Sequence, residues 1–365
     1  MNRFWLYCFR EPSLRRDSTE RIGEIISIAK GSKMKRRFLS SVLILVIFTV
    51  GFSIVGSAED QNAVESTQTE NQQVAMEANI VTKVFLPIAL AVIMLGMGLS
   101  LTTGDFKRVM IYPKATVLGM LNQLILLPII AFVYAKIFPL SPELAVGLMI
   151  LAVCPGGVTS NLISHVSKGD TALSITLTAI SGVITVITIP FILSYSLEYF
   201  MDGGQNISLP IGKTIIQIFI ITVIPVSIGM SIRSLTKNFA NKMGKPVKVI
   251  SIIFFVLVLI AAILSEKDDL PEMFKRVGIA ALVLNVTTML LGFFTSRLAK
   301  LNPPQSITIS IESGIQNGTL AIVIATSILN NTQMSITPAI YSLLMFVTGG
   351  FMMFYFGTKN SNLKS

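Results

Sequence analysis

Glu312 is the most informative residue of this 365-residue chain, because it is the one acidic side chain that falls inside an apolar span. The other Asp and Glu residues lie in the N-terminal tail, in loops or at the ends of apolar runs. A charged side chain at membrane depth costs about 2.5 to 3.5 kcal/mol on insertion scales, so it usually marks a functional site. The plain alternative is a glutamate that snorkels to the membrane surface near the start of its helix, which we place at Leu301.

Two glycine-rich stretches interrupt apolar spans. Residues 154–161 read Cys-Pro-Gly-Gly-Val-Thr-Ser-Asn, and residues 312–319 read Glu-Ser-Gly-Ile-Gln-Asn-Gly-Thr. Proline removes a backbone donor and glycine permits non-helical backbone, which is tolerated at membrane depth only where it lines protein or a cavity. We expect both stretches to break their helices; two unrelated kinks are the alternative.

The composition excludes a water-soluble fold. The chain is 52% hydrophobic and 13% charged, with a mean hydropathy of +0.72, whereas soluble proteins carry about 25% charged residues. Two cysteines and one histidine exclude a disulfide framework and a Cys/His metal cluster. Much of the net charge of +10 lies in the N-terminal tail, and no basic stripe is interleaved with aromatic residues. Nucleic acid is therefore not expected as a partner.

The spaces between charged residues predict an all-α polytopic membrane protein with nine or ten transmembrane helices. The broken stretches fall in the fourth and ninth spans, which is the same place in two halves of five helices. Because five is odd, the halves have opposite orientation, and paired broken helices in inverted repeats indicate a transporter binding site. The expected spans are 38–58, 84–103, 115–135, 144–167, 171–197, 214–232, 249–265, 277–296 and two within 301–358 that are separated by a polar turn at 330–333.

Lys and Arg fall on alternate loops, which predicts a multi-pass protein of the plasma or inner membrane with a cytoplasmic C-terminus. Residues 38–58 are either the first transmembrane helix or a signal peptide, and both readings place the acidic segment 59–79 outside. The expected regions are a basic tail (1–37), the first helix or signal (38–58), an external linker (59–79), a transmembrane domain (80–358) and a cytoplasmic tail (359–365).

Three runs of residues resemble a known family. They are Pro155-Gly156-Gly157 with Ser160-Asn161, Lys168-Gly169-Asp170 with Ser174 and Thr178, and Glu312 with Gly314 and Gln316-Asn317-Gly318. In these runs the chain is similar to the bile acid:sodium symporter family. The resemblance implies a panel domain and a core domain, whose crossed, unwound helices hold two sodium ions.

The resemblance also implies which residues bind sodium. The first site would comprise Ser160, Asn161, Ser174, Thr178 and Glu312. The second would comprise Gln123, Glu312 and Gln316 with the backbone carbonyls of Ser313 and Ile315. Hydroxyl, amide, carbonyl and carboxylate oxygens suit a hard cation.

Charge balance then predicts the transported solute. Two Na⁺ ions and one carboxylate leave one positive charge, which a monoanionic substrate facing half-helix N-termini would neutralise. We expect Na⁺-driven uptake of an organic anion, either a bile acid or steroid conjugate or a small carboxylate, with no cofactor besides Na⁺. Asn317, Thr159 and Val158 are the candidate substrate residues, and Val158 stands where bacterial members have threonine.

Two other functions stay open. A proton-coupled antiporter could use the lone buried carboxylate to carry H⁺, and a membrane sensor could bind a ligand without transporting it. An intramembrane protease is excluded by the lack of paired aspartates, a His-Glu-x-x-His motif or a Ser/His dyad at depth.

Overall fold

The structure is a computed structural model that describes residues 84–201, 209–264 and 270–359. The chain divides into two compact units, residues 1–69 and 70–365, and all of the described residues belong to the second. The expected basic tail (1–37), first helix or signal (38–58) and external linker (59–79) lie outside the described residues.

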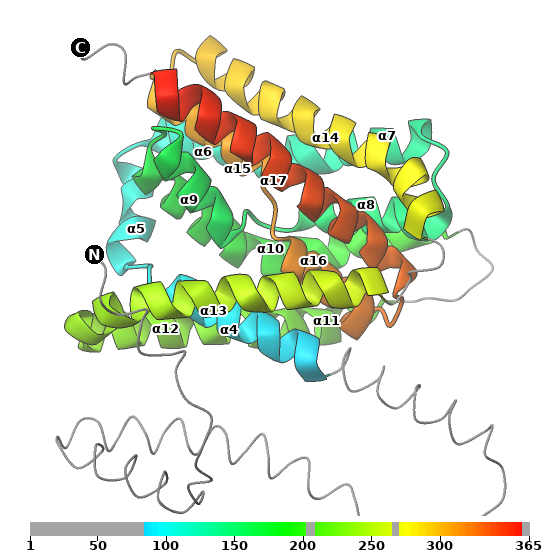
Figure 1. The fold of residues 1–365 in the computed structure, drawn as a ribbon, viewed down its shortest axis with the longest axis horizontal. Helices are drawn as coiled ribbons and strands as arrows, with labels where there is room; N and C mark the ends of the chain where they lie inside the picture. Colours follow the sequence, from blue (N-terminus) through cyan, green and yellow to red (C-terminus); the bar gives the residue numbers. More distant parts are fainter. Residues whose placement is uncertain (1–83, 202–208, 265–269, 360–365) are drawn as a thin grey trace, which may run out of the picture. The chain divides into compact units, whose positions relative to one another are not determined.

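The second unit is built of helices (Figure 1), and within its described residues the only β-type pairing is an isolated bridge between Gly156 and Gln316. The elements in chain order are α4 (Leu86–Gly98), α5 (Thr103–Lys107), η2 (Arg108–Met110), α6 (Pro113–Leu121), η3 (Asn122–Leu126), α7 (Leu127–Ile137), α8 (Pro142–Val153), α9 (Val158–Val166), α10 (Thr171–Phe200), α11 (Ile211–Ile218), η4 (Phe219–Val223), α12 (Ile224–Leu235), α13 (Lys237–Leu264), α14 (Leu270–Leu298), α15 (Pro303–Gly314), α16 (Gly318–Val323), η5 (Ile324–Ile328) and α17 (Gln333–Lys359).

These helices confirm an all-α membrane fold. Five of them are long and apolar enough to cross a membrane, and the number rises to seven if each of two bent pairs is one span. The shorter apolar helices Pro142–Val153 and Gly318–Ile328 belong to the two expected broken spans. Each expected span from residue 84 onward contains helix, and Asn330, with a φ of 53°, lies in the expected turn before α17.

The second expected span ends earlier than the charge pattern indicated. Helix α4 stops at Gly98, and the chain bends by 74° into the helical segment Thr103–Met110. Asp105 causes this new start, because its Oδ2 accepts hydrogen bonds from the backbone N–H and the hydroxyl of Thr102, at 2.7 Å each. This cap gives a partner to the backbone N–H of Thr102, which a helix start otherwise leaves without one.

The helices pack in two layers (Figure 1). Helices α4, α11, α12 and α13 with the π-helical turn η4 form one, which we call the panel layer, and α7, α8, α10 and α14 to α17 form the core layer. Gly98 and Gly229 allow α4 and α12 to touch through their backbones, since a Cβ on Gly229 would lie 2.5 Å from the Leu95 carbonyl oxygen. Arg233 adds a hydrogen bond of 2.8 Å to the Leu99 carbonyl.

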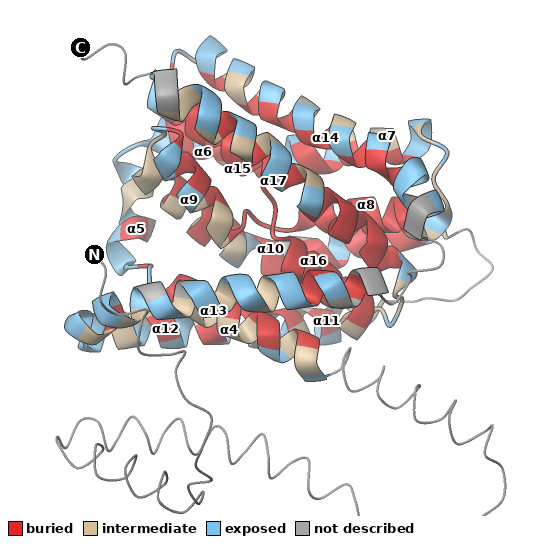
Figure 2. Ribbon diagram, viewed as in Figure 1, coloured by how far each residue is buried: buried red, intermediate tan, exposed pale blue. Residues whose placement is uncertain are grey.

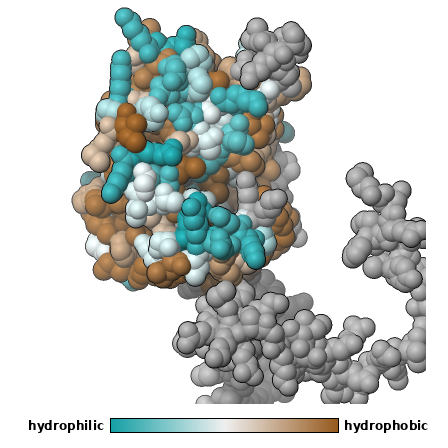
Figure 3. All heavy atoms as spheres, turned by 90° about the vertical axis from the view of Figure 1, so that its left-hand side faces the viewer, coloured by the Kyte–Doolittle hydropathy of each residue, from teal (hydrophilic) through white to brown (hydrophobic). Residues whose placement is uncertain are grey.

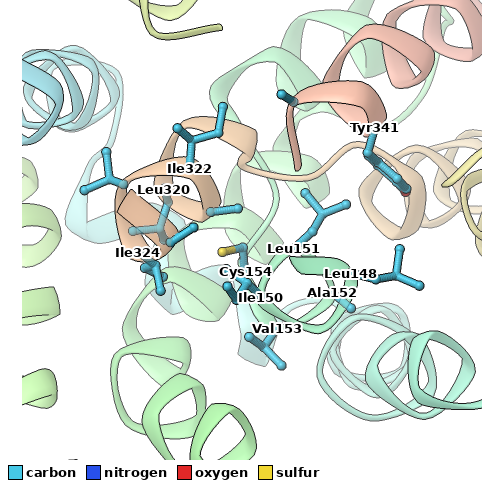
Figure 4. Packing of buried hydrophobic residues seen from close by; sticks show 14 of the residues in the cluster. Leu148, Ile150, Leu151, Ala152, Val153, Cys154, Leu320, Ile322, Ile324 and Tyr341 are labelled. Atoms are coloured by element: carbon cyan, nitrogen blue, oxygen red, sulfur yellow. The ribbon is translucent and has the colours of Figure 1, made fainter. Parts of the chain in front are cut away.

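The most deeply buried segment is also unusually polar. Every residue from Gln305 to Thr326 is buried, although α15 carries Ser, Thr, Gln and Glu side chains, and Figure 2 shows buried residues along α15 and α16. Leu151 of α8 and Cys154, which follows α8, share one apolar cluster with Leu320 and Ile322 of α16 (Figure 4). The core layer therefore holds the broken helices at its centre.

Candidate functional site

The two interruptions cross each other. Helix α8 ends at Val153 and α9 begins at Val158, while α15 ends at Gly314 and α16 begins at Gly318. An antiparallel bridge joins Gly156 to Gln316, and the Asn317 N–H donates to the Pro155 carbonyl at 2.9 Å. The freed backbone groups of one break thus bind those of the other, as buried backbone requires.

Glycine is needed where the strands cross. A Cβ on Gly156 would lie 2.5 Å from Glu312 Oε2, and one on Gly157 would lie 3.3 Å from the Gln316 carbonyl oxygen. The first distance is far below van der Waals contact. The glycines therefore allow the carboxylate of Glu312 to lie directly against the opposite break.

Polar oxygens from two other helices, α9 and α10, surround the Glu312 carboxylate. The Ser174 hydroxyl donates to Oε1, and Thr178 Oγ1 lies 3.0 Å from Oε2. Asn161 directs its Oδ1 to the same hydroxyls, 2.8 Å from Ser174 Oγ. Ser174 and Thr178 are one turn apart on α10, so both face the cluster. Glu312 is only 3% exposed.

Ser160 completes this first cluster from the first turn of α9. Its hydroxyl donates to the Gly157 carbonyl at 2.6 Å, and the Cβ position of Gly156 lies between its Oγ (3.6 Å) and the Glu312 carboxylate (2.5 Å). The structure therefore brings together all five residues expected at the first site.

The hydroxyl protons in this cluster are outnumbered by acceptors. Ser174 Oγ has two acceptors within hydrogen-bond distance, and Thr178 Oγ1 has three. Each hydroxyl carries one proton, so several oxygen lone pairs face one another without a hydrogen between them. Such a group of oxygens is suited to a cation.

Gln123 and Gln316 form a second cluster beside the first. Gln123 lies in the π-helical turn η3, and its Nε2 donates to Gln316 Oε1 at 2.7 Å and to the Cys154 carbonyl at 3.2 Å. Gln316 Nε2 in turn donates to the Ser313 carbonyl at 2.9 Å. Ile315 follows α15 in extended conformation, with φ −103° and ψ 100°. The residues expected at the second site are thus also neighbours.

A cavity between the layers touches the crossing point. Its lining includes Pro155, Gly156 and Asn317 of the breaks, and Thr178 and Thr185 of α10. The panel layer contributes mainly apolar side chains, with three methionines, and two hydroxyls. These panel residues include Met94, Met97, Met230, Thr222 and Ser227. No Lys, Arg, Asp or Glu occurs among the described residues that line this cavity.

The three candidate substrate residues are placed differently. Asn317 lines the cavity, and its Oδ1 caps α16 by accepting from the Leu320 N–H at 3.0 Å. Val158 and Thr159 begin α9 and are not among the lining residues. Their part in substrate binding stays a prediction.

Comparison with known proteins gives the family. Residues 87–272, just over half of the chain, match the Sodium Bile acid symporter family. The chain belongs to this family. Membership makes it a sodium-coupled membrane transporter rather than an enzyme, with Na⁺ as the coupling ion and no further cofactor.

Its relatives include bacterial, plant and animal proteins. An uncharacterized sodium-dependent transporter of Bacillus subtilis, YocS, is 29% identical over 76% of this chain and 88% of its own length. The probable chloroplastic sodium/metabolite cotransporter BASS1 of Arabidopsis thaliana is 28% identical over 74% of this chain and 66% of its own length. The hepatic sodium/bile acid cotransporter of Rattus norvegicus is 28% identical over 68% of each chain.

The sequence did not predict which residues of the panel layer line the symporter's cavity. Methionines such as Met94 and Met230 are indistinguishable in sequence from packing or lipid-facing residues. It also missed Asn285 and Tyr341, which contact the break from α14 and α17. A buried amide in the middle of a span is a signal that could have identified Asn285.

Proposed function

We propose that this symporter couples the inward movement of Na⁺ to the uptake of an organic anion by alternating access. The observation that carries the proposal is the Glu312 cluster, in which one carboxylate and an excess of oxygen lone pairs meet at the crossing of two broken helices. Buried acceptors that have no donor are costly unless a cation joins them.

We assign the first Na⁺ to Ser160, Asn161, Ser174, Thr178 and Glu312. Na⁺ would be coordinated by the oxygen lone pairs that accept no hydrogen bond. The hydroxyl protons would meanwhile continue to donate to carbonyl or carboxylate oxygens. Five oxygen-bearing side chains from α9, α10 and α15 are already gathered there. Binding therefore needs little rearrangement, which lowers its entropic cost.

We assign the second Na⁺ to Gln123, Glu312 and Gln316 with the carbonyls of Ser313 and Ile315. The amide N–H groups of both glutamines are directed at some of these oxygens. Rotation of the two amides would replace donors by acceptors and open the site to a cation.

Thr178 links the ions to the substrate. Its hydroxyl contacts Glu312, and the same residue lines the cavity. Gly156 and Asn317 of the crossed breaks also line it. Bound ions would order these groups, which form one side of the substrate site. This arrangement would couple Na⁺ binding directly to substrate binding.

The cavity favours an anion with a large apolar part. Half of its lining residues are methionine, leucine, valine or isoleucine, and its polar side chains are four hydroxyls and one amide. Two Na⁺ ions and one carboxylate have a net charge of +1, which would neutralise a monoanion. The half-helix N-termini at the breaks would add to this attraction. Bile acids or steroid conjugates suit this lining better than small carboxylates do.

Alternating access would arise from movement between the panel and core layers, since the cavity lies between them. Figure 3 shows hydrophilic side chains gathered on the face that lies at the left of Figure 1. Exposed lysines occur at helix ends and in loops of the described residues, among them Lys107, Lys168 and Lys237. The enrichment of Lys and Arg in cytoplasmic loops assigns this hydrophilic face to the inside of the cell membrane, with the C-terminus. Residues 59–79 would then be external.

The test is sodium-specific stabilisation followed by flux. Purified full-length protein in detergent is melted in NaCl, KCl and choline chloride, for the wild type and Glu312→Gln. A ligand of the folded state raises the free energy of unfolding by RT ln(1 + [L]/Kd), so we expect a rise in Tm in Na⁺ alone, absent in the variant. Equal melting in all three salts would contradict the proposal.

Proteoliposomes then separate the remaining alternatives. Taurocholate and pyruvate are offered as a bulky and a small anion under an inward Na⁺ gradient, and we expect accumulation of the bulky one. Accumulation that follows a pH gradient without Na⁺ would identify a proton-coupled antiporter instead. Substrate binding without flux in either gradient would identify a sensor.

A further inference from the structure

The carbonyl of Gly314, the last residue of α15, accepts two hydrogen bonds from other helices. Asn285 Nδ2 of α14 lies 2.7 Å from this oxygen, and the Tyr341 hydroxyl of α17 lies 2.9 Å from it. Asn285 Nδ2 is also 3.1 Å from the Tyr341 oxygen. Both side chains are fully buried. The two N–H protons of the amide and the one O–H proton therefore close a small ring of hydrogen bonds.

This ring supplies hydrogen-bond donors to the Gly314 carbonyl in the last turn of α15. Carbonyls at a helix C-terminus have no partner within the helix. The Ile311 carbonyl accepts from the Ile315 N–H at 2.8 Å, and the Ser313 carbonyl accepts from Gln316 Nε2 at 2.9 Å. The donors to Gly314 come instead from α14 and α17. The Ser313 carbonyl is thus bound by a side chain of its own break, and the Gly314 carbonyl by side chains of two other helices.

Fixing the Gly314 carbonyl also fixes the next one. Ile315 is extended, with φ −103° and ψ 100°, and successive carbonyls of extended backbone point to opposite sides. With the Gly314 oxygen held against α14 and α17, the Ile315 oxygen is directed away from those helices. The proposed second Na⁺ has the Ile315 oxygen as a ligand, so binding requires that this carbonyl be held in one direction.

We propose that Asn285 and Tyr341 are positioning residues for the second sodium site. Their shared hydrogen bonds to Gly314 set the orientation of the Ile315 carbonyl. This inference rests on the proposed function, because it presupposes sodium at that site. Removing either donor leaves the Gly314 carbonyl with one hydrogen bond instead of two, which weakens the hold on the peptide between Gly314 and Ile315.

The experiment is an NaCl titration of Tm for full-length protein in detergent, with choline chloride keeping ionic strength constant. Tyr341→Phe removes the hydroxyl and keeps the ring, and Asn285→Ala removes the amide. The matched control is Tyr134→Phe, which removes a different tyrosine hydrogen bond to α14, that between Tyr134 and Thr287 at 3.0 Å, on α7 and away from the break.

We expect Tyr341→Phe and Asn285→Ala each to raise the Na⁺ concentration for half-maximal stabilisation by about three- to tenfold, the range for one hydrogen bond. The control should lower Tm without moving that midpoint. If Asn285→Ala does not fold, Tyr341→Phe decides alone. Midpoints of Tyr341→Phe and the wild type within twofold of each other would overturn the inference while leaving the proposed function intact. A wild type that does not respond to Na⁺ would overturn both.

Discussion

The side-chain amides of Gln123 and Gln316 lie 2.7 Å apart, nitrogen to oxygen, although 193 residues separate them in the chain. Their N–H groups also reach the carbonyls of Cys154 and Ser313. In the second cluster the amide N–H groups therefore already bind its oxygens, whereas the Glu312 cluster has more acceptors than protons. This contrast predicts that the two proposed sodium sites differ in affinity and fill in order, the Glu312 cluster first.

Gln316→Ala should remove the second of the two proposed sodium sites and retain the first. The first cluster keeps all of its side chains, but the second loses an amide oxygen and the donor to Ser313. We expect the dependence of uptake on Na⁺ to be sigmoidal in the wild type and to approach a Hill coefficient of about 1 in the variant. Radioactive Na⁺ binding at saturation provides the count, and an unchanged stoichiometry would refute the assignment.

Gly156→Ala should abolish the response to Na⁺. The added methyl group would lie 2.5 Å from Glu312 Oε2, so either the carboxylate or the bridge between the breaks must move. We expect a lower Tm and no further rise on adding NaCl. Gly350→Ala is the control, because a Cβ there meets nothing within 4 Å, and its sodium response should match that of the wild type.

Thr178→Val and Thr185→Val should separate ion binding from substrate binding. Both threonines line the cavity, but only Thr178 contacts Glu312. Valine keeps the shape and removes the hydroxyl. We expect Thr178→Val to raise both the Na⁺ midpoint and the substrate KM in proteoliposome uptake, and Thr185→Val to change the substrate KM alone. Equal Na⁺ midpoints in both variants would contradict the linking role of Thr178.

Gly229→Ala should destabilise the panel layer without altering sodium affinity. A Cβ at this position would lie 2.5 Å from the Leu95 carbonyl oxygen and 2.8 Å from the Gly98 carbonyl carbon, which forces α4 and α12 apart. Overpacking of this kind costs about 1 to 3 kcal/mol. Thermal unfolding should show a lower Tm in choline chloride, while the Na⁺ midpoint of the folded fraction stays unchanged.

Much of the fold could be predicted from the sequence because a membrane imposes simple constraints. A carboxylate, a proline or paired glycines inside a span are costly there, so Glu312, Pro155 and Gly156 were recognisable without a structure. The break positions agree with that expectation, whereas the neighbours of Glu312 were expected only from the family resemblance.

The remainder depended on features that hydrophobicity does not encode. Met94 and Met230 line a cavity, yet lipid-facing methionines look the same in sequence. The start of α5 carries a cap between Thr102 and Asp105, which the apolar pattern does not register. The direction of the Ile315 carbonyl depends on donors from two other helices.

The bridge between Gly156 and Gln316 also bears on biosynthesis. The Pro155 carbonyl obtains its donor from Asn317, which the ribosome adds long after the fourth span has entered the bilayer. Until then the first interruption exposes unpaired backbone, at a cost of several kcal/mol in hydrocarbon. We therefore expect the assembly of the N-terminal half of this transporter to be complete only when the C-terminal half has been added.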